Sequence, residues 1–216
     1  MGFHTFDPAS ADKLEDESRY RYLSREELVV ALALDADGSD AVADFGSGTG
    51  FYTDDVAPFA GEVRAVDVQE EMHERYREKG VPENVSLVTA DVDDLPFGDD
   101  ELDAAFSTMT FHEFAGSGGG QDSDGENGNG ESGSAESENG GSGDDGNGAE
   151  AEIARVLRDG GRFVVADWTA NGDGESGPPV GERYDRDEAV RLLEEAGFEV
   201  VRADERPETF LVVAER

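Results

Sequence analysis

Strand-like and helix-like segments alternate along most of this chain, and this order restricts its possible folds more than any other feature. Short apolar runs alternate with longer segments of helical periodicity. Because strands joined by helices pair in parallel through right-handed crossovers, the order predicts an α/β, doubly wound sheet. The predicted strands are residues 41–46, 62–68, 85–92, 102–110, 161–168, 198–203 and 209–214, and the predicted helices are residues 24–34, 50–60, 69–80, 151–161 and 186–197.

The last two predicted strands differ from the others because no helix separates them. A short turn around Pro207 joins residues 198–203 to residues 209–214. A connection this short allows only antiparallel neighbours. We therefore expect a mostly parallel, seven-stranded, Rossmann-like sheet with one antiparallel strand near its C-terminal end.

An acidic segment rich in glycine and serine interrupts the alternation after the strand at residues 102–110. Between Ala115 and Ala149 no apolar side chain is larger than alanine, and the segment contains 13 of the 28 glycines. It cannot bury enough apolar surface to offset the entropy lost on ordering. Since an ordinary strand–helix pair flanks it, we predict a disordered insertion at residues 115–149 within a single domain over residues 1–216.

The formal net charge of −36 is the strongest feature of the composition. The insertion contributes eight of the 53 acidic residues, so about −28 remains on the rest of the chain, which has two lysines and 15 arginines. The acids are scattered rather than focused, which indicates adaptation to high salt, where ions screen their repulsion. A basic partner or a multivalent cation site is the alternative interpretation. The negative charge argues against nucleic-acid binding.

Several classes of site and location are disfavoured by what the sequence lacks. Without cysteine there are no disulfides, catalytic thiolates or cysteine-rich metal sites. The histidines His4, His73 and His112 lack metal-ligand spacing, so no metal is expected, and the first two are expected on the surface. The longest apolar run, Leu28–Leu34, is too short to cross a membrane, and no signal-peptide pattern is present. We expect a cytoplasmic protein.

The stretch VADFGSGTG, residues 42–50, places three glycines between a predicted strand and a predicted helix. Ligands of open parallel sheets bind beyond the C-terminal ends of the strands, where glycines allow close approach of the backbone. A dinucleotide site would need G-x-G-x-x-G, but the last position is Phe51 when counted from Gly46 and Thr53 when counted from Gly48. Asp44 would repel a pyrophosphate and suits a ligand with ammonium and sulfonium charges. A plain strand-to-helix turn and a nicotinamide oxidoreductase are the alternatives.

Five segments in order resemble class I S-adenosylmethionine-dependent methyltransferases of the small-molecule methyltransferase-domain type. They are VADFGSGTG, VRAVDVQEEM, VTADVDDLPF, LDAAFSTMTFHEF and IARVLRDGGRFVVADW. The later stretch GPPVGERYDRDEAVRLLEEAGFEVV is similar to a subgroup with a Gly-Pro-Pro loop. The resemblance covers nearly the whole chain outside the insertion.

This resemblance implies S-adenosylmethionine as the cofactor and assigns its contacts. The methionine part would contact Asp44, the backbone of Gly46, Ser47, Gly48 and Gly50, and the strand end at Ser107 and Thr108. The nucleoside would contact Asp67 at the ribose hydroxyls, Val68 at the adenine, Asp91 at the adenine amino group, and the backbone of Val92. Residues 1–35 would form a cover arm and helix, with Tyr20 and Tyr22 as candidates for the acceptor pocket and Trp168 as another wall.

Methyl transfer needs mainly alignment of the acceptor, the methyl group and the sulfur. A general base helps only when the acceptor must lose a proton. His112, and then Glu113, are the candidate catalytic residues because they leave the fourth strand over the expected methyl group. The alternative is that both only end the strand and cap the loop. Methylation of exocyclic base amines is disfavoured because STMTFHEF stands where an Asn/Asp-Pro-Pro-Tyr/Phe-like motif would be.

The sequence therefore predicts an S-adenosylmethionine-dependent methyltransferase acting on a small-molecule acceptor, of quinone-, lipid- or natural-product-like character. The alternative is a non-catalytic cofactor-binding or protein-interaction module that uses the acidic insertion. Nothing in the sequence indicates the oligomeric state.

Overall fold

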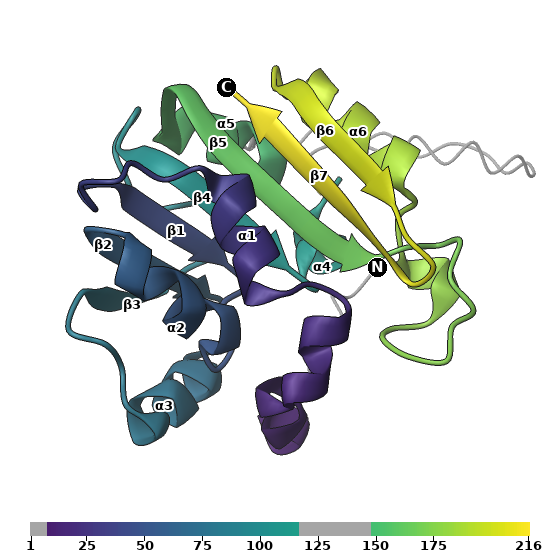
Figure 1. Cartoon of the computed structure of the whole chain (residues 1–216), viewed down its shortest axis with the longest axis horizontal. Helices are drawn as coiled ribbons and strands as arrows, with labels where there is room; N and C mark the ends of the chain where they lie inside the picture. Colours follow the sequence, from purple (N-terminus) through teal and green to yellow (C-terminus); the bar gives the residue numbers. More distant parts are fainter. Residues whose placement is uncertain (1–7, 117–147) are drawn as a thin grey trace, which may run out of the picture.

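A single seven-stranded sheet forms the centre of the computed structural model, which describes residues 8–116 and 148–216. Helices cover both of its faces (Figure 1). The strand order is β3-β2-β1-β4-β5-β7-β6. The strands are β1 (Ala41–Phe45), β2 (Glu62–Asp67), β3 (Val85–Thr89), β4 (Leu102–Thr108), β5 (Leu157–Trp168), β6 (Glu199–Glu205) and β7 (Thr209–Glu215).

The pairing of the strands confirms the predicted doubly wound topology. β1 pairs in parallel with β2 and β4, β2 with β3, and β4 with β5. β7 is antiparallel to both β5 and β6 and is therefore the one reversed strand. The direction in which strands are added changes between β1 and β4, so a ligand-binding crevice is expected at their C-terminal ends.

Ten short helices surround the sheet in the described part of the chain. The α-helices are α1 (Arg25–Leu32), α2 (Phe51–Val56), α3 (Glu70–Lys79), α4 (Phe111–Phe114), α5 (Ala149–Val156) and α6 (Arg186–Glu195), and the 3-10 helices are η1 (Pro8–Glu15), η2 (Glu17–Arg21), η3 (Ala57–Phe59) and η4 (Val180–Glu182). None of these helices combines the length and the apolar character that a membrane crossing requires.

Alternation along the strands divides the core into two apolar clusters. Val42 belongs to the cluster that contains residues of α1, α2 and α3, whereas its neighbour Ala43 belongs to the cluster with α5 and α6. Successive side chains of a strand point to opposite faces, so both faces of β1 are buried. The site residues therefore project from the end of the sheet, where the strands stop.

Several predicted element boundaries are wrong, and two of them have a local reason. The helix predicted at 50–60 ends as α2 at Val56 and continues as η3, where Pro58 has no N–H for a helical bond. The helix predicted at 151–161 ends at Val156, because Leu157 already pairs with Leu102 of β4. The strand predicted at 85–92 ends at Thr89.

Most of the predicted disordered insertion, residues 117–147, lies outside the described residues. The segments on either side of these residues are held to the folded domain by hydrogen bonds. The backbone N–H of Gly116 donates to the carboxylate of Glu150 at 2.8 Å, and Tyr184 Oη donates to the carbonyl of Ala115, also at 2.8 Å. Residues 115–116 and 148–149 are thus part of the folded domain, and the insertion stays a prediction for the residues between them.

Candidate active site

A pocket with a volume of about 760 Å³ lies at the C-terminal ends of the central strands. This size lies within the range of sites for small molecules and cofactors. The predicted site residues that line it are Gly46, Ser47, Gly48, Asp67, Val68, Asp91, Val92, Thr108, His112 and Glu113. Three predicted cofactor residues, Asp44, Gly50 and Ser107, are buried or turned away and are not part of its wall.

The glycine turn between β1 and α2 forms the floor of the pocket. Gly46, Gly48 and Gly50 all have positive φ angles, of 77°, 53° and 80°. A Cβ at Gly46 would lie 2.3 Å from Cγ2 of Thr110, and one at Gly50 would lie 2.1 Å from the ring of Tyr76. Side chains at these two positions are therefore excluded by contact as well as by backbone conformation. Gly50 serves the packing of the turn rather than the surface of the pocket.

Asp67, the last residue of β2, holds the glycine turn in place from the side. Its two carboxylate oxygens accept the backbone N–H groups of Gly48 and Gln69, both at 2.8 Å. Burial raises the pKa of Asp67, although these two hydrogen bonds oppose the rise. Each oxygen can accept further bonds, so a ligand hydroxyl at the pocket wall would find an acceptor here.

Asp44 lies beneath the turn, next to the predicted contacts of the methionine part. Its Oδ2 accepts the hydroxyl of Thr53 at 2.6 Å, and its Oδ1 is buried with no partner among the described residues. Burial raises the pKa of Asp44 to about 7. Ser47 Oγ and Ser107 Oγ are also buried without a partner in this part of the chain. Of these three residues only Ser47 lines the pocket, so its hydroxyl is the polar group that a ligand there could reach.

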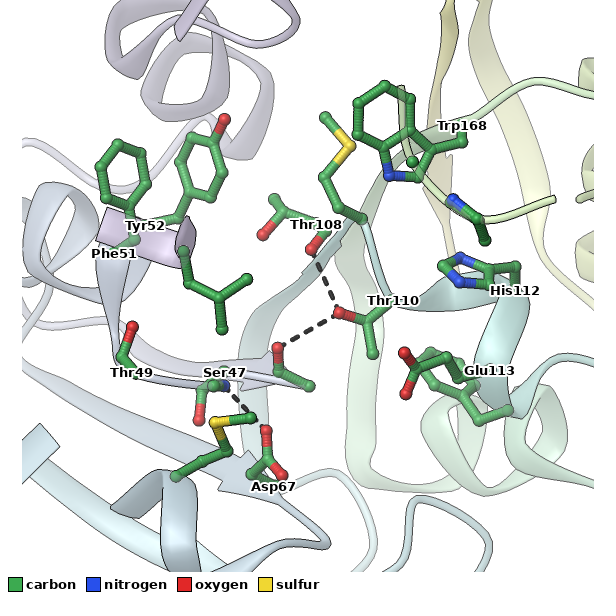
Figure 2. Close-up of a pocket in the computed structure, with 18 of the residues that line it drawn as sticks. Ser47, Thr49, Phe51, Tyr52, Asp67, Thr108, Thr110, His112, Glu113 and Trp168 are labelled. Atoms are coloured by element: carbon green, nitrogen blue, oxygen red, sulfur yellow. Dashed lines mark hydrogen bonds between the residues drawn. The ribbon is translucent and has the colours of Figure 1, made fainter. Parts of the chain in front are cut away.

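His112, at the start of α4, is held by Asp167 from the neighbouring strand β5. Its Nδ1 lies 2.9 Å from Oδ2 of Asp167, and its backbone N–H donates to the same oxygen at 2.7 Å. The Asp167 side chain is only 1% exposed. Burial favours the neutral imidazole, but the charge and hydrogen bond of Asp167 outweigh it and raise the pKa of His112. With Nδ1 engaged, Nε2 is the nitrogen available to an acceptor (Figure 2).

Glu113 lies beside His112 on the same wall of the pocket (Figure 2). Burial raises its pKa to about 7, partly opposed by His112 and reinforced by Asp67 and Asp167. Two neighbouring titratable groups whose pKa values are both raised at one pocket are typical of a site of proton transfer.

The N-terminal arm covers the pocket, but only one of its two predicted tyrosines lines it. Tyr22 packs edge-on against Trp168, with ring centroids 4.6 Å apart, and both residues are in the wall. Tyr20 instead packs against Phe51 and donates its hydroxyl to Asp55 at 2.8 Å. Two arm residues with this spacing point in different directions, as expected for i and i+2 positions.

Sequence reasoning missed some pocket residues and misplaced one histidine. The missed pocket residues include Arg19 and Thr110. Asp167, which is buried behind His112 and does not line the pocket, was also missed, although it could have been noticed as an acid near the end of a strand beside β4. His73, expected on the surface, is fully buried, with Nδ1 3.0 Å from Oγ1 of Thr89. Among the described residues no group of histidines and acids has the arrangement of a metal site.

Comparisons with known proteins point to one kind of enzyme. A family model described as a methyltransferase domain matches residues 43–121, which begin within β1 and include the glycine turn and α4. No curated protein sequence matches the chain. Among solved structures, the chain is similar to an S-adenosylmethionine-dependent methyltransferase from Aquifex aeolicus, with 27% identity over 97% of this chain and 98% of that one and a TM-score of 0.74.

Two further structures share the fold at lower identity. One is a chain from the complex of the Haloferax volcanii Trm112 methyltransferase activator with a methyltransferase, at 19% identity over 96% of each chain and a TM-score of 0.65. The other is an S-adenosylmethionine-dependent methyltransferase from Mesorhizobium loti, at 17% identity over 89% of this chain and 98% of that one, with a TM-score of 0.63. The domain match and the Aquifex aeolicus similarity support a class I S-adenosylmethionine-dependent methyltransferase, with S-adenosylmethionine as its cofactor.

Proposed function

We propose that this protein methylates a small molecule at an atom that must lose a proton, with His112 as the general base. The observation that carries this proposal is the contact between His112 and Asp167 at the wall of the pocket, where Nδ1 and the backbone N–H share one carboxylate. A histidine held in this way keeps one orientation and one tautomer, which is what general base catalysis requires.

The pocket residues divide into a cofactor part and an acceptor part. Asp67, Val68 and Asp91 would hold the nucleoside, and the glycine turn would hold the methionine part. The bound cofactor supplies a methyl group already activated by its sulfonium charge. His112, Trp168 and Tyr22 lie on the remaining wall, which leaves a concave and partly aromatic space for the acceptor. Such a space supports a small molecule rather than a polymer as the substrate.

The residues of the chain contribute orientation and proton transfer. The acceptor would lie between the aromatic pair Tyr22–Trp168 and the imidazole of His112. Nε2 of His112 would receive the proton of the acceptor, and Asp167 would stabilise the resulting imidazolium. Glu113, whose pKa is raised to about 7, would be the second group able to exchange a proton at this wall.

The proposal is tested by incubating the full chain with methyl-labelled S-adenosylmethionine and a metabolite extract, in molar potassium chloride, with mass detection of labelled products. The wild type should label at least one small molecule, and His112→Ala should label none while its affinity for S-adenosylhomocysteine, measured by calorimetry, stays unchanged. Absence of cofactor binding by the wild type would contradict the proposal as a whole. Equal labelling by wild type and His112→Ala would contradict only the role of His112 as the general base.

A further inference from the structure

The arginine and lysine side chains that lack an ion pair gather at the pocket. Of the 17 basic side chains, all of which the structure describes, 13 pair with a carboxylate. The four that pair with no carboxylate of the described residues are Lys13, Arg19, Arg21 and Arg183, and the first three line the pocket. In a chain with 53 acidic residues, unpaired cations at one place indicate that an anion is expected from outside the protein.

Of these three residues, Arg19 has the guanidinium that is held most firmly at the pocket. It belongs to η2 of the arm and is half-buried. Its Nη1 donates to the carbonyl of Leu14 at 2.6 Å, and its guanidinium carbon lies 5.0 Å and 5.2 Å from the ring centroids of Phe51 and Tyr52. Stacking over two rings and one backbone hydrogen bond hold the guanidinium in place, and its remaining donors have no hydrogen-bond acceptor in the described part of the chain.

The surroundings of Arg19 lie on the cofactor side of the pocket. Phe51 and Tyr52 begin α2, directly after the glycine turn, and they lie across the pocket from His112 and Trp168 (Figure 2). Leu14, the partner of Arg19, would be 3.3 Å from a Cβ at Gly48. An anion that reached Arg19 would therefore belong to a ligand lying over the turn, not to an acceptor at His112.

Glu15, the acid of the arm whose charge acts on Arg19, is already engaged elsewhere. Glu15 accepts the hydroxyl of Thr49 and pairs with Lys79 at 3.2 Å. Burial lowers the pKa of Arg19, and the nearby charges of Glu15 and Asp44 oppose this shift. A guanidinium keeps its positive charge in proteins. A half-buried charge without a partner is unfavourable, and a carboxylate that fits the planar guanidinium would remove this penalty.

We propose that Arg19 binds the methionine carboxylate of the cofactor, which makes the N-terminal arm part of the cofactor site. This inference rests on the proposed function, because it requires S-adenosylmethionine in the pocket. The arm then recognises ligands that retain the amino-acid carboxylate and discriminates against nucleosides that have lost it. Arg21, which contacts the Tyr22 hydroxyl and lies 3.4 Å from Ser176 Oγ, remains on the acceptor side.

The test compares two ligands that differ only in the carboxylate. Calorimetry in molar potassium chloride would measure S-adenosylhomocysteine and its decarboxylated analogue, S-adenosyl-3-thiopropylamine, against wild type and Arg19→Gln. Arg19→Gln should bind S-adenosylhomocysteine about 10- to 100-fold more weakly, as expected for a hydrogen-bonded charge pair, and the analogue with unchanged affinity. Unchanged binding of the analogue also shows that the variant is folded.

Arg25→Gln is the matched control, since Arg25 pairs with Asp55 at 3.0 Å and does not line the pocket. It should leave both affinities unchanged. Arg19→Lys keeps the charge without the planar fork, so it should lose less affinity for S-adenosylhomocysteine than Arg19→Gln. Equal losses for both ligands, or no loss for either, would overturn the role of Arg19. A wild type that binds neither ligand would instead contradict the proposed function.

Discussion

Asp167 binds His112 through two different nitrogen atoms: its carboxylate accepts the backbone N–H at 2.7 Å and lies 2.9 Å from the ring Nδ1. The two residues come from α4 and β5 and are 55 positions apart in the chain. Because both contacts involve one buried carboxylate, the direction of the imidazole depends on Asp167 as much as on its own backbone.

Asp167→Asn should lower the turnover of a proton-bearing acceptor by about 10²- to 10⁴-fold, because it disturbs the tautomer and stability of the base. In the wild type the pKa of His112 is raised above its usual 6.5. Because only neutral His112 can act as a base, kcat should fall as the pH drops below this raised pKa, which gives the acidic limb of the pH profile. Removing the charge lowers this pKa, so the acidic limb should move to lower pH. Single-turnover rates of label transfer across pH measure both effects.

Glu113→Gln is the control for that profile, because the pKa of Glu113 is raised to about 7 and could produce a similar limb. The acidic limb of the pH–rate profile should persist in Glu113→Gln. A limb that survives in Asp167→Asn at the same pH but disappears in Glu113→Gln would transfer the role of base to Glu113.

Asp67→Ala should weaken S-adenosylmethionine binding by about 1–3 kcal/mol, since a buried acceptor for ligand hydroxyls is lost. The N–H groups of Gly48 and Gln69 also lose their partner, so the turn itself becomes less restrained. Calorimetry measures the change, with exposed Glu83→Ala as a control of equal charge change. An affinity equal to that of the wild type would show that the ribose lies elsewhere.

Gly50→Ala should destabilise the fold by more than Gly160→Ala, although the two glycines have nearly equal φ angles of 80° and 75°. A Cβ at Gly50 would overlap the ring of Tyr76, whereas no described residue has an atom within 4 Å of one at Gly160. Both variants share a backbone strain of about 1–3 kcal/mol, and overpacking adds about 1–3 kcal/mol at Gly50 alone. Chemical denaturation in constant salt gives the two free energies of unfolding. Equal values would mean that the Tyr76 ring moves aside freely.

Asp44→Asn should reduce the dependence of stability on pH. The pKa of Asp44 is raised from its ordinary 3.8 to about 7 in the fold, so the native state binds more protons than the unfolded state between these values. The free energy of unfolding therefore falls as pH rises through this window. The variant lacks this contribution and should show a smaller fall. Thermal melts across the window measure it, with exposed Asp37→Asn as the control of equal charge; matching slopes in both variants would contradict the assignment.

Salt should stabilise the protein strongly, because 53 acidic residues face only 17 basic ones. The screening length falls from about 10 Å at 0.1 M to about 3 Å at 1 M, which reduces repulsion between carboxylates. The melting temperature should therefore rise as potassium chloride increases through this range. A series in sucrose, which stabilises by exclusion without screening, is the control. A melting temperature insensitive to potassium chloride would contradict adaptation to high salt.

Local patterns were sufficient for the order and type of the strands. The strand predicted at 41–46 is β1 at Ala41–Phe45, and the one predicted at 209–214 is β7 at Thr209–Glu215. Each pattern depends on neighbours in the sequence: apolar periodicity, glycine after a strand, and a linker too short for a crossover. For the same reason the glycine turn and the acid ending β2 could be placed at the pocket before any contact was known.

Only the tertiary structure decided which distant side chains meet. The sequence on its own determined an α/β sheet with a glycine turn, and it singled out His112 at a strand exit. It could not pair His112 with Asp167, bury His73, or bring Arg19 over Phe51, because these contacts depend on how β4, β5 and the arm pack rather than on spacing along the chain. Packing thus determined that Asp167 is the partner of His112 and that Arg19 lies beside Phe51 and Tyr52, which directly follow the glycine turn.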